Sequence, residues 1–164
     1  MPSKDDCPCS SGLKYRACCA PYHRGEREAP DAEALMRSRY AAFARKDVAH
    51  LWRTLHPDHE ERAGHGEAEL TRALRATVDR FRYTGLSILD RSGPDQGGIA
   101  RVLFLARVFE KGADRSFVEL SEFAHDGEGW RYLRGESLPV SQIAGDPLAL
   151  RIESFGVAGP ARGG

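Results

Sequence analysis

Residues 99–125 read IARVLFLARVFEKGADRSFVELSEFAH, and this stretch decides the fold class. It holds two apolar-rich runs, Ile99–Phe109 and Arg115–His125, which alternate with the period of two typical of β-strands. Between them, residues 111–114 (KGAD) indicate a tight turn, because glycine and aspartate adopt the backbone angles that turns require. The stretch therefore predicts a β-hairpin.

The neighbouring segments extend this hairpin into a sheet. Asp126-Gly127 predicts a second hairpin, which leads into a strand over Trp130–Arg134. Residues 83–90 also alternate, and they precede a turn region, 91–98, that is rich in glycine and proline. Consecutive strands joined by hairpins predict an antiparallel sheet.

Upstream of the strands, the apolar residues recur with the spacing of amphipathic helices. Asp31 is placed to cap a helix that ends near residue 46, and further helices are predicted over Val48–Leu55 and Glu67–Phe81, with a loop around Gly64. Helices followed by strands indicate an α+β domain, with the helices packed on one face of the sheet.

All four cysteines lie near the N-terminus, and they are Cys7, Cys9, Cys18 and Cys19. Two close pairs can supply the corners of one tetrahedral zinc site, with Zn–S bonds of about 2.3 Å. We expect zinc rather than disulfides, because adjacent cysteines pair poorly and no secretory signal precedes them. Four thiolates leave no open position, so the expected zinc is structural. His23 is the alternative to Cys19 as fourth ligand.

The spacer between the cysteine pairs predicts a short helix, capped by Ser10-Ser11 and ending at Cys18-Cys19. Lys14 and Arg16 are expected to offset the negative charge of the thiolates. Residues 20–30 contain two prolines, a glycine and several charges, so they are predicted to be a linker.

Two family resemblances follow from these residues. The pattern Cys-x-Cys, Ser-Gly-x-x-Tyr and Cys-Cys over Cys7–Cys19 resembles the SEC-C motif, the zinc-binding tail of the SecA translocation ATPase. This resemblance implies that Cys7, Cys9, Cys18 and Cys19 are the zinc ligands. In SecA the module docks proteins and contacts the ribosome.

The body resembles the YchJ-like family, whose central domain is a nuclear transport factor 2-like cone. The match rests on Leu35–Phe43, His56-Pro57, Glu119-x-Ser121-x-Phe123 and Trp130-x-Tyr132. The resemblance implies a curved sheet with a pocket between sheet and helices. Many relatives carry a second SEC-C copy at the C-terminus, whereas this chain has no cysteine after Cys19.

The expected organisation has three parts. Residues 1–28 form the zinc module with its linker, 29–137 form the α+β cone, and 138–164 form a C-terminal extension. The last segment, Gly156–Gly164, is rich in glycine, alanine and proline and is predicted to be disordered.

The cone offers one candidate site. Strand alternation places Phe117, Glu119 and Ser121 on one face together with Phe123 and His125, and places Val118 on the other. Arg37 and Arg39 on the first helix are expected to lie near Glu119. The catalytic candidates are Glu119 or His56 as general base, with Arg39 or Tyr40 polarising an oxygen.

Ordinary structural roles compete with these assignments. A glutamate beside an arginine is more often an ion pair than a catalytic base. His56 at a helix end is explained equally well by the helix dipole. His59, His65 and His125 are expected to be exposed, and Trp52, Trp130 and Tyr132 are expected to lie in the core.

Two functions fit the sequence. The first is a non-enzymatic binding or adaptor protein, whose zinc module docks a protein partner and whose cone forms a homodimer or holds a small ligand. The second is a lyase, isomerase or hydrolase of the cone superfamily.

Composition narrows the partners and the location. Lysines and arginines number 24 and aspartates and glutamates also 24, which argues against a nucleic-acid partner. A basic patch of Lys14, Arg16, Arg24 and Arg27 is interrupted by acidic residues. No apolar run is long enough to cross a membrane, so we expect a cytoplasmic protein.

Overall fold

Four long antiparallel strands form the sheet in the order β1-β2-β4-β5 in the computed structural model, which describes residues 3–158. Their bounds are Arg82–Ser92 for β1, Ala100–Glu110 for β2, Phe117–His125 for β4 and Trp130–Pro139 for β5. A short strand β3, Ala113–Asp114, pairs with the end of β2. The antiparallel sheet is as predicted, but β5 runs five residues past its predicted end at Arg134 and pairs with β4 to its far end.

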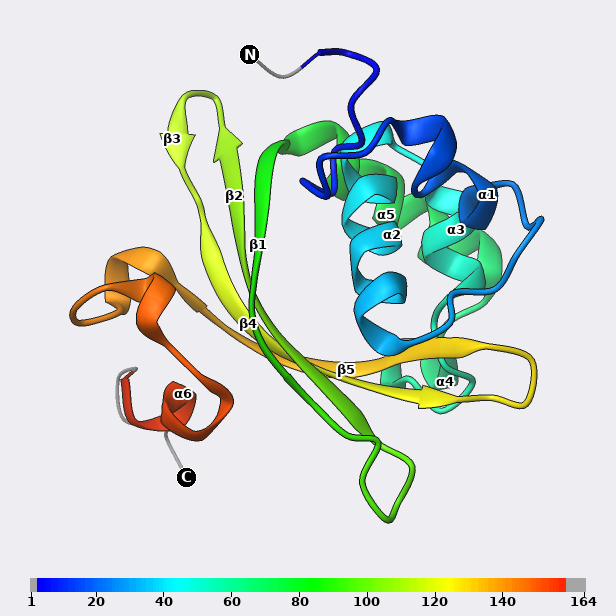
Figure 1. Cartoon of the computed structure of the whole chain (residues 1–164). Helices are drawn as coiled ribbons and strands as arrows, with labels where there is room; N and C mark the ends of the chain where they lie inside the picture. The colour runs from blue at the N-terminus through cyan, green and yellow to red at the C-terminus, as the bar shows by residue number, and fades with distance from the viewer. Residues whose placement is uncertain (1–2, 159–164) are drawn as a thin grey trace.

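The helices cover one face of the curved sheet (Figure 1). They are α2 (Ala32–Arg45), α3 (Val48–Arg53), α4 (Glu60–Gly64) and α5 (Glu67–Arg80). The α+β prediction is confirmed, and Asp31 caps α2 by accepting a hydrogen bond from the Ala34 amide at 2.8 Å. The short helix α4 was not predicted. None of the helices within residues 3–158 has the length and apolar character needed to span a membrane.

The predicted helix between the cysteine pairs does not form. The chain instead makes one 3₁₀ turn, η1 (Tyr15–Ala17), and then a short helix, α1 (Ala20–His23). Ser10 and Gly12 have φ values of 66° and 86°, in the left-handed region that interrupts a right-handed helix. This reversal turns the first cysteine pair back toward the second.

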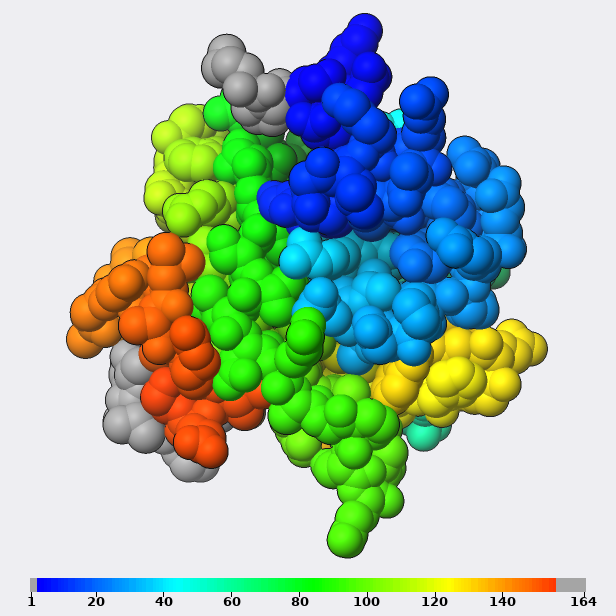
Figure 2. All heavy atoms as spheres, viewed as in Figure 1, coloured from blue at the N-terminus to red at the C-terminus, as the bar shows by residue number. Residues whose placement is uncertain are grey.

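Residues 20–30 are not a free linker. Figure 2 shows the N-terminal segment lying directly on α2 and against β1. Ala20 and Ala29 are buried, and His23 is only 9% exposed. Arg53 on α3 donates to the backbone carbonyl of Tyr22 at 3.0 Å, which fixes α1 on the helical layer. The N-terminal module, defined here as residues 3–28, is therefore packed on the cone.

The C-terminal segment covers the opposite face of the sheet (Figure 1). It forms two 3₁₀ turns, η2 (Val140–Gln142) and η3 (Pro147–Ala149), and a helix, α6 (Ile152–Ala158). Leu150 and Phe155 pack there against the strand residues Leu103, Leu105 and Val118. Asp90 on β1 accepts a hydrogen bond from the Ile152 amide at 2.9 Å.

This arrangement corrects part of the prediction for the tail. Helix α6 extends to Ala158, so residues 156–158, where disorder was predicted, are helical. The remainder of that predicted segment, residues 159–164, lies outside the described residues.

Candidate metal centre and cone cavity

The structure brings the four cysteines into one cluster. Their sulfur atoms all lie within 4.8 Å of one another. Cys9 Sγ lies 3.6 Å from Cys18 Sγ, which in turn lies 3.9 Å from Cys19 Sγ. These distances far exceed a disulfide bond of about 2.0 Å. A tetrahedron with metal–sulfur bonds of about 2.3 Å has edges of roughly 3.8 Å, so the cluster can hold a metal ion such as zinc.

Local backbone hydrogen bonds build this cluster. The Cys7 amide donates to the Leu13 carbonyl at 2.9 Å, and the Ser10 amide donates to the Cys7 carbonyl at 3.2 Å, which closes a tight loop around the first pair. The Cys18 amide donates to Tyr15 in the 3₁₀ turn at 3.0 Å and orients the second pair. The fold of the loop, rather than a helix, therefore sets the sulfur positions.

The cluster is suited to a cation. Cys7, Cys9 and Cys19 are at most 4% exposed, and the Ser11 hydroxyl lies 3.1 Å from Cys18 Sγ. Contacts with the Cys7 and Cys9 sulfurs, and then burial, raise the pKa of the Cys19 thiol, because a further anion among thiolates is disfavoured. A bound cation reverses this preference and favours deprotonated sulfur. Lys14, predicted to offset the cluster's charge, pairs instead with Asp6 at 2.8 Å.

Two side-chain contacts fasten the cluster to the cone. Arg37 on α2 donates from Nη1 to the Cys9 carbonyl at 2.9 Å, and the Leu86 amide on β1 donates to Ser10 Oγ at 3.1 Å. Arg37 was expected near Glu119, and that expectation is wrong. It lies on the part of α2 that faces the metal cluster.

His23 does not contribute to the cluster. Its Nε2 lies 2.7 Å from the Ser38 carbonyl, so Nε2 carries the proton, and its Nδ1 lies 2.6 Å from the Tyr15 hydroxyl. Both ring nitrogens are thus engaged away from the sulfurs. Ser38 Oγ also lies 2.9 Å from Nε2 of His50, whose ring is 4.6 Å from that of His23. No sequence pattern indicated this buried pair, because it forms where α1, α2 and α3 meet.

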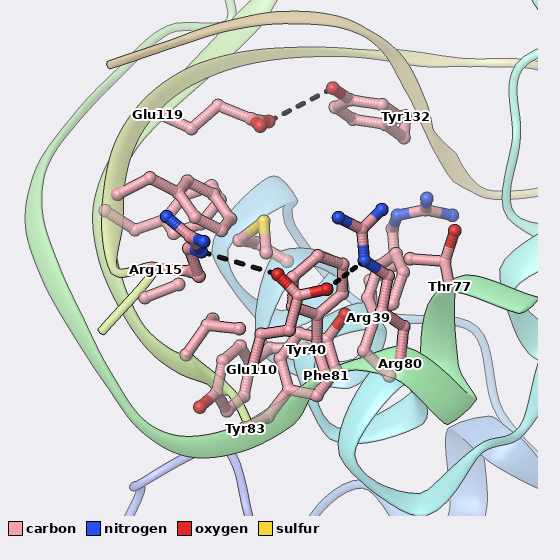
Figure 3. A pocket seen from close by; sticks show the side chains of 16 residues that line it. Arg39, Tyr40, Thr77, Arg80, Phe81, Tyr83, Glu110, Arg115, Glu119 and Tyr132 are labelled. Carbon is pink, nitrogen blue, oxygen red and sulfur yellow. Dashed lines mark hydrogen bonds and ion pairs between the residues drawn. The ribbon is translucent and has the colours of Figure 1, made fainter. Parts of the chain in front are cut away.

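A cavity of about 410 Å³ lies between the helices and the concave face of the sheet (Figure 3). Its walls are mainly apolar and aromatic. They are formed by Met36, Phe43, Phe81, Tyr83, Phe104, Ala106, Val108 and Phe117. This size and composition are typical of small-molecule sites, which range over roughly 300–1,000 Å³.

Three of the four catalytic candidates line this cavity. They are Glu119, Arg39 and Tyr40. Glu119 accepts hydrogen bonds from the hydroxyls of Tyr132, at 3.0 Å, and Ser121. No ion pair to Glu119 is formed within residues 3–158, so the expected pairing with Arg39 is not observed. The Tyr40 hydroxyl accepts a hydrogen bond from the Gly85 amide at 2.7 Å, where β1 is bulged.

His56 lies apart from these residues. It is not among the residues that line the cavity, and its Nδ1 accepts a hydrogen bond from the Asp58 amide at 3.0 Å. The structure thus brings Glu119, Arg39 and Tyr40 together and leaves His56 at the turn after α3.

Arg39 is buried, with 5% of its surface exposed. Its Nη1 donates to the Leu51 carbonyl at 3.0 Å and to Thr54 Oγ1 at 2.6 Å. The guanidinium lies 4.8 Å from the centre of the Tyr132 ring. Burial lowers the pKa of Arg39 to about 10, against the opposing influence of Tyr132 and Glu119, so the group stays charged at neutral pH.

A group of charges that the sequence analysis missed also lines the cavity (Figure 3). Glu110 on β2 pairs with Arg80 at the end of α5 and with Arg115, at 3.4 Å, after β3. These residues come from three separate elements, so their meeting depends on strand register. The sequence pattern carried no signal for it.

The predicted exposure of the other histidines and aromatic residues is confirmed for some of them and wrong for others. His65 and His125 are exposed, as expected, but His59 is only 8% exposed and stacks near Tyr132 at 5.5 Å between ring centres. Tyr132 was expected in the core and packs against it, but it also lines the cavity.

Comparison with known proteins gives matches to both parts of the chain. Residues 31–135 match the model of the YchJ middle NTF2-like domain, and residues 4–21 match the SEC-C motif. A SEC-C motif containing protein from Rhodopseudomonas palustris, solved in solution, is 34% identical. The match covers 80% of this chain and 98% of that one, with a TM-score of 0.69.

A second solved structure has the same fold. It is a SEC-C motif containing protein from Psychrobacter arcticus, 24% identical, with 87% of this chain and 88% of that one covered and a TM-score of 0.66.

Proposed function

This chain belongs to the YchJ family with its middle NTF2-like domain, preceded here by a SEC-C motif, and we propose that it is a non-catalytic binding protein. In this proposal, zinc bound by Cys7, Cys9, Cys18 and Cys19 holds the N-terminal module on the cone, and the cavity binds a small, largely apolar molecule. The proposal places the protein in the cytoplasm, where thiols stay reduced.

One observation carries this proposal, and it is the cavity of about 410 Å³ with its mainly apolar and aromatic walls. Binding of an apolar ligand in a cavity of this size lowers the free energy, because apolar surfaces of the ligand and the walls are removed from water. The metal cluster packs in the same buried core as Met36 and Tyr40 of α2, which also line the cavity. Zinc with four thiolates has no open position, so its role in this proposal is structural.

The binding test uses the neutral fluorescent dye aminoanthracene. We expect the metal-loaded protein to bind the dye and to lose this binding when Ala106→Leu fills the cavity. Arg107→Leu on the same strand is the matched control, because Arg107 is exposed on the opposite face. Equal dye binding by Ala106→Leu and Arg107→Leu would argue that the dye lies elsewhere, and the proposal would fail.

The zinc part of the proposal has its own test. Mass spectrometry of the native protein and elemental analysis should give one zinc ion per chain, and Cys9→Ser should lose it. Another metal at full occupancy, or no metal, would contradict zinc as the structural ion.

An enzyme is the second candidate, and one observation favours it. Glu119 reaches the cavity without an ion pair and is held by two hydroxyl groups. A carboxylate in such a place can act as a general base. Carbonyl compounds incubated with the protein in D₂O should then exchange their α-hydrogens, and Glu119→Gln should stop this exchange. Equal exchange with Glu119→Gln would remove Glu119 from consideration.

Docking of a protein partner by the N-terminal module is a further part of the proposal. Leu13 in the cysteine loop is a large apolar residue that is 54% exposed, so it is the side chain chosen to test such a contact. A pull-down with Leu13→Ser should lose a partner that the wild type retains, while the metal content stays the same. Retention of every partner by both Leu13→Ser and the Cys18→Ser, Cys19→Ser variant would oppose docking.

A further inference from the structure

Arg39 is a buried cation for which the described part of the chain provides no carboxylate within ion-pair distance. Arg37 and Arg131, for example, each pair with a glutamate. Arg39 instead contacts a backbone carbonyl, a hydroxyl and an aromatic ring. A buried charge is costly unless it is paired. Arg39 therefore places a positive charge at the cavity that no aspartate or glutamate within residues 3–158 neutralises by a direct ion pair.

The remaining donors of Arg39 are available to a ligand. A guanidinium has five N–H groups, and the two contacts to Leu51 and Thr54 both come from Nη1. No buried side-chain nitrogen lacks a partner in the described chain, so the Nε and Nη2 groups are not sealed inside protein. Arg39 lines both the cavity and a second hollow, so a ligand can reach those groups from one of these two spaces.

The two carboxylates that line the cavity already have partners within the protein. Glu110 is shared by Arg80 and Arg115 at one end. Glu119 accepts from the hydroxyls of Ser121 and Tyr132. The cavity walls carry three guanidinium groups and two carboxylates, which leaves an excess of positive charge.

A second hollow, which shares Arg39 and Tyr132 with the cavity, is lined by Asp58, Glu60, Glu61 and Glu136 and also by Arg134. Its acidic residues outnumber its arginines, so this hollow repels an anion. An anion that reaches Arg39 is therefore favoured on the aromatic side, where Phe104 and Phe117 form the walls.

We propose that the cavity binds an organic monocarboxylate, with its carboxylate on Arg39 and its aliphatic or aromatic body among the apolar walls. This inference rests on the proposed binding function and specifies its ligand class. A planar carboxylate matches the fork of a guanidinium, and one unpaired guanidinium balances one negative charge. A doubly charged phosphate would meet the nearby Glu119 with too little positive charge to compensate.

The test compares decanoate with decanol, which share the same apolar chain. We measure both affinities by calorimetry on the metal-loaded, full-length wild type, Arg39→Met and Arg75→Met. Arg75→Met removes the same charge from an exposed position on α5. The wild type and Arg75→Met should prefer decanoate by roughly tenfold or more, as expected for a charge-assisted hydrogen bond. Arg39→Met should lose this preference and keep its affinity for decanol.

Each outcome is informative. Equal binding of decanoate and decanol by the wild type would overturn the carboxylate inference and leave the apolar binding function intact. Failure of both probes to bind would count against the binding function itself. A preference that persists in Arg39→Met would show that another group recognises the anion. If Arg39→Met does not fold, the wild-type comparison still decides whether the cavity selects an anion.

Discussion

At the residue scale, the cavity depends on buried and half-buried polar side chains that are hydrogen-bonded to one another. Glu119, Ser121 and Tyr132 form one such group, and no buried side-chain nitrogen or oxygen in the described residues lacks a partner. Because an unmade hydrogen bond in the interior is costly, each member of the group fixes the position of the others.

Removing the Tyr132 hydroxyl should therefore destabilise the protein. Tyr132→Phe deletes the donor to Glu119, and hydrogen bonds to charged groups contribute about 2 kcal/mol. We expect urea unfolding to show a loss of about that size. Tyr83 also lines the cavity, and its hydroxyl makes no hydrogen bond within residues 3–158, so Tyr83→Phe should change the free energy of unfolding by less than about 0.5 kcal/mol. Equal effects of the two substitutions would contradict this role of Tyr132.

His50 should make stability depend on pH. Burial, followed by the neighbouring His23 and Arg53, lowers the pKa of His50 to about 2, whereas the unfolded chain has the ordinary value of about 6.5. The unfolded state alone takes up this proton, so stability is lost as pH falls below about 6.5. Between pH 7 and pH 5 the loss from His50 is about 2 kcal/mol.

The pH effect is measured as a difference between variants. His50→Gln can still donate to Ser38 and should lose about 2 kcal/mol less than the wild type over this range. His65→Gln, at an exposed position, controls for the loss of a histidine. Parallel pH profiles for the wild type and His50→Gln would contradict the assignment.

The sequence supports predictions at this scale only where chemistry and spacing coincide. The four cysteines could be grouped because they are close in sequence and share one kind of chemistry. The directions of Arg37 and Arg39 could not be predicted, because that of Arg37 depends on how the N-terminal module sits on α2 and that of Arg39 on how α3 packs against α2. The burial of His59 follows from helix α4, which no pattern indicated.

At the element scale, the N-terminal module is attached to α2 and β1 by a few defined contacts. The Arg37 hydrogen bond to the Cys9 carbonyl is one of them. Loss of this contact should loosen the cysteine loop. Arg37→Met is expected to release its metal to a chelator roughly tenfold faster, because a hydrogen bond from a charged donor contributes about 1.5 kcal/mol or more.

The matched control for this release is Arg16→Met. Arg16 lies in the 3₁₀ turn beside Cys18 and is exposed, and it should leave the release rate close to that of the wild type. Faster release from both variants would indicate that the lost positive charge near the cluster causes the effect, and not the lost attachment of the cysteine loop to α2.

The C-terminal segment is predicted to stabilise the fold by covering the outer face of the sheet. Phe155 is 1% exposed and packs in the core on the outer face, while Leu148 nearby is 44% exposed. Phe155→Ala should cost about 3–5 kcal/mol of folding free energy, whereas Leu148→Ala should stay within about 0.5 kcal/mol. A small effect of Phe155→Ala in urea unfolding would indicate that the segment does not contribute to stability.

The strands and long helices could be predicted from sequence because their periodicity is local. For the opposite reason, strand β5 is longer than predicted and helix α6 was not predicted. Ser137, Leu138 and Pro139 become strand by pairing with β4, and α6 lies on a sheet face formed by distant residues. Such long-range partners leave little trace in the local pattern.

At the scale of the whole molecule, the metal cluster and the cavity share one core. Cys7, Cys9 and Cys19 belong to the same buried cluster as Met36 and Tyr40, which also line the cavity. The N-terminal module thus packs in the same core as the cavity walls, and a metal held by the cysteines would contribute to the folding free energy.

The central claim, that the metal braces the cone, is tested most directly by hydrogen–deuterium exchange of the metal-loaded and metal-free protein. We predict that metal removal increases exchange in residues 3–19 and also in α2 and β1, which contact the cysteine loop through Arg37 and Leu86. The exposed hairpin between β4 and β5 serves as the internal reference. Faster exchange confined to residues 3–19, with α2 and β1 unchanged, would contradict the claim.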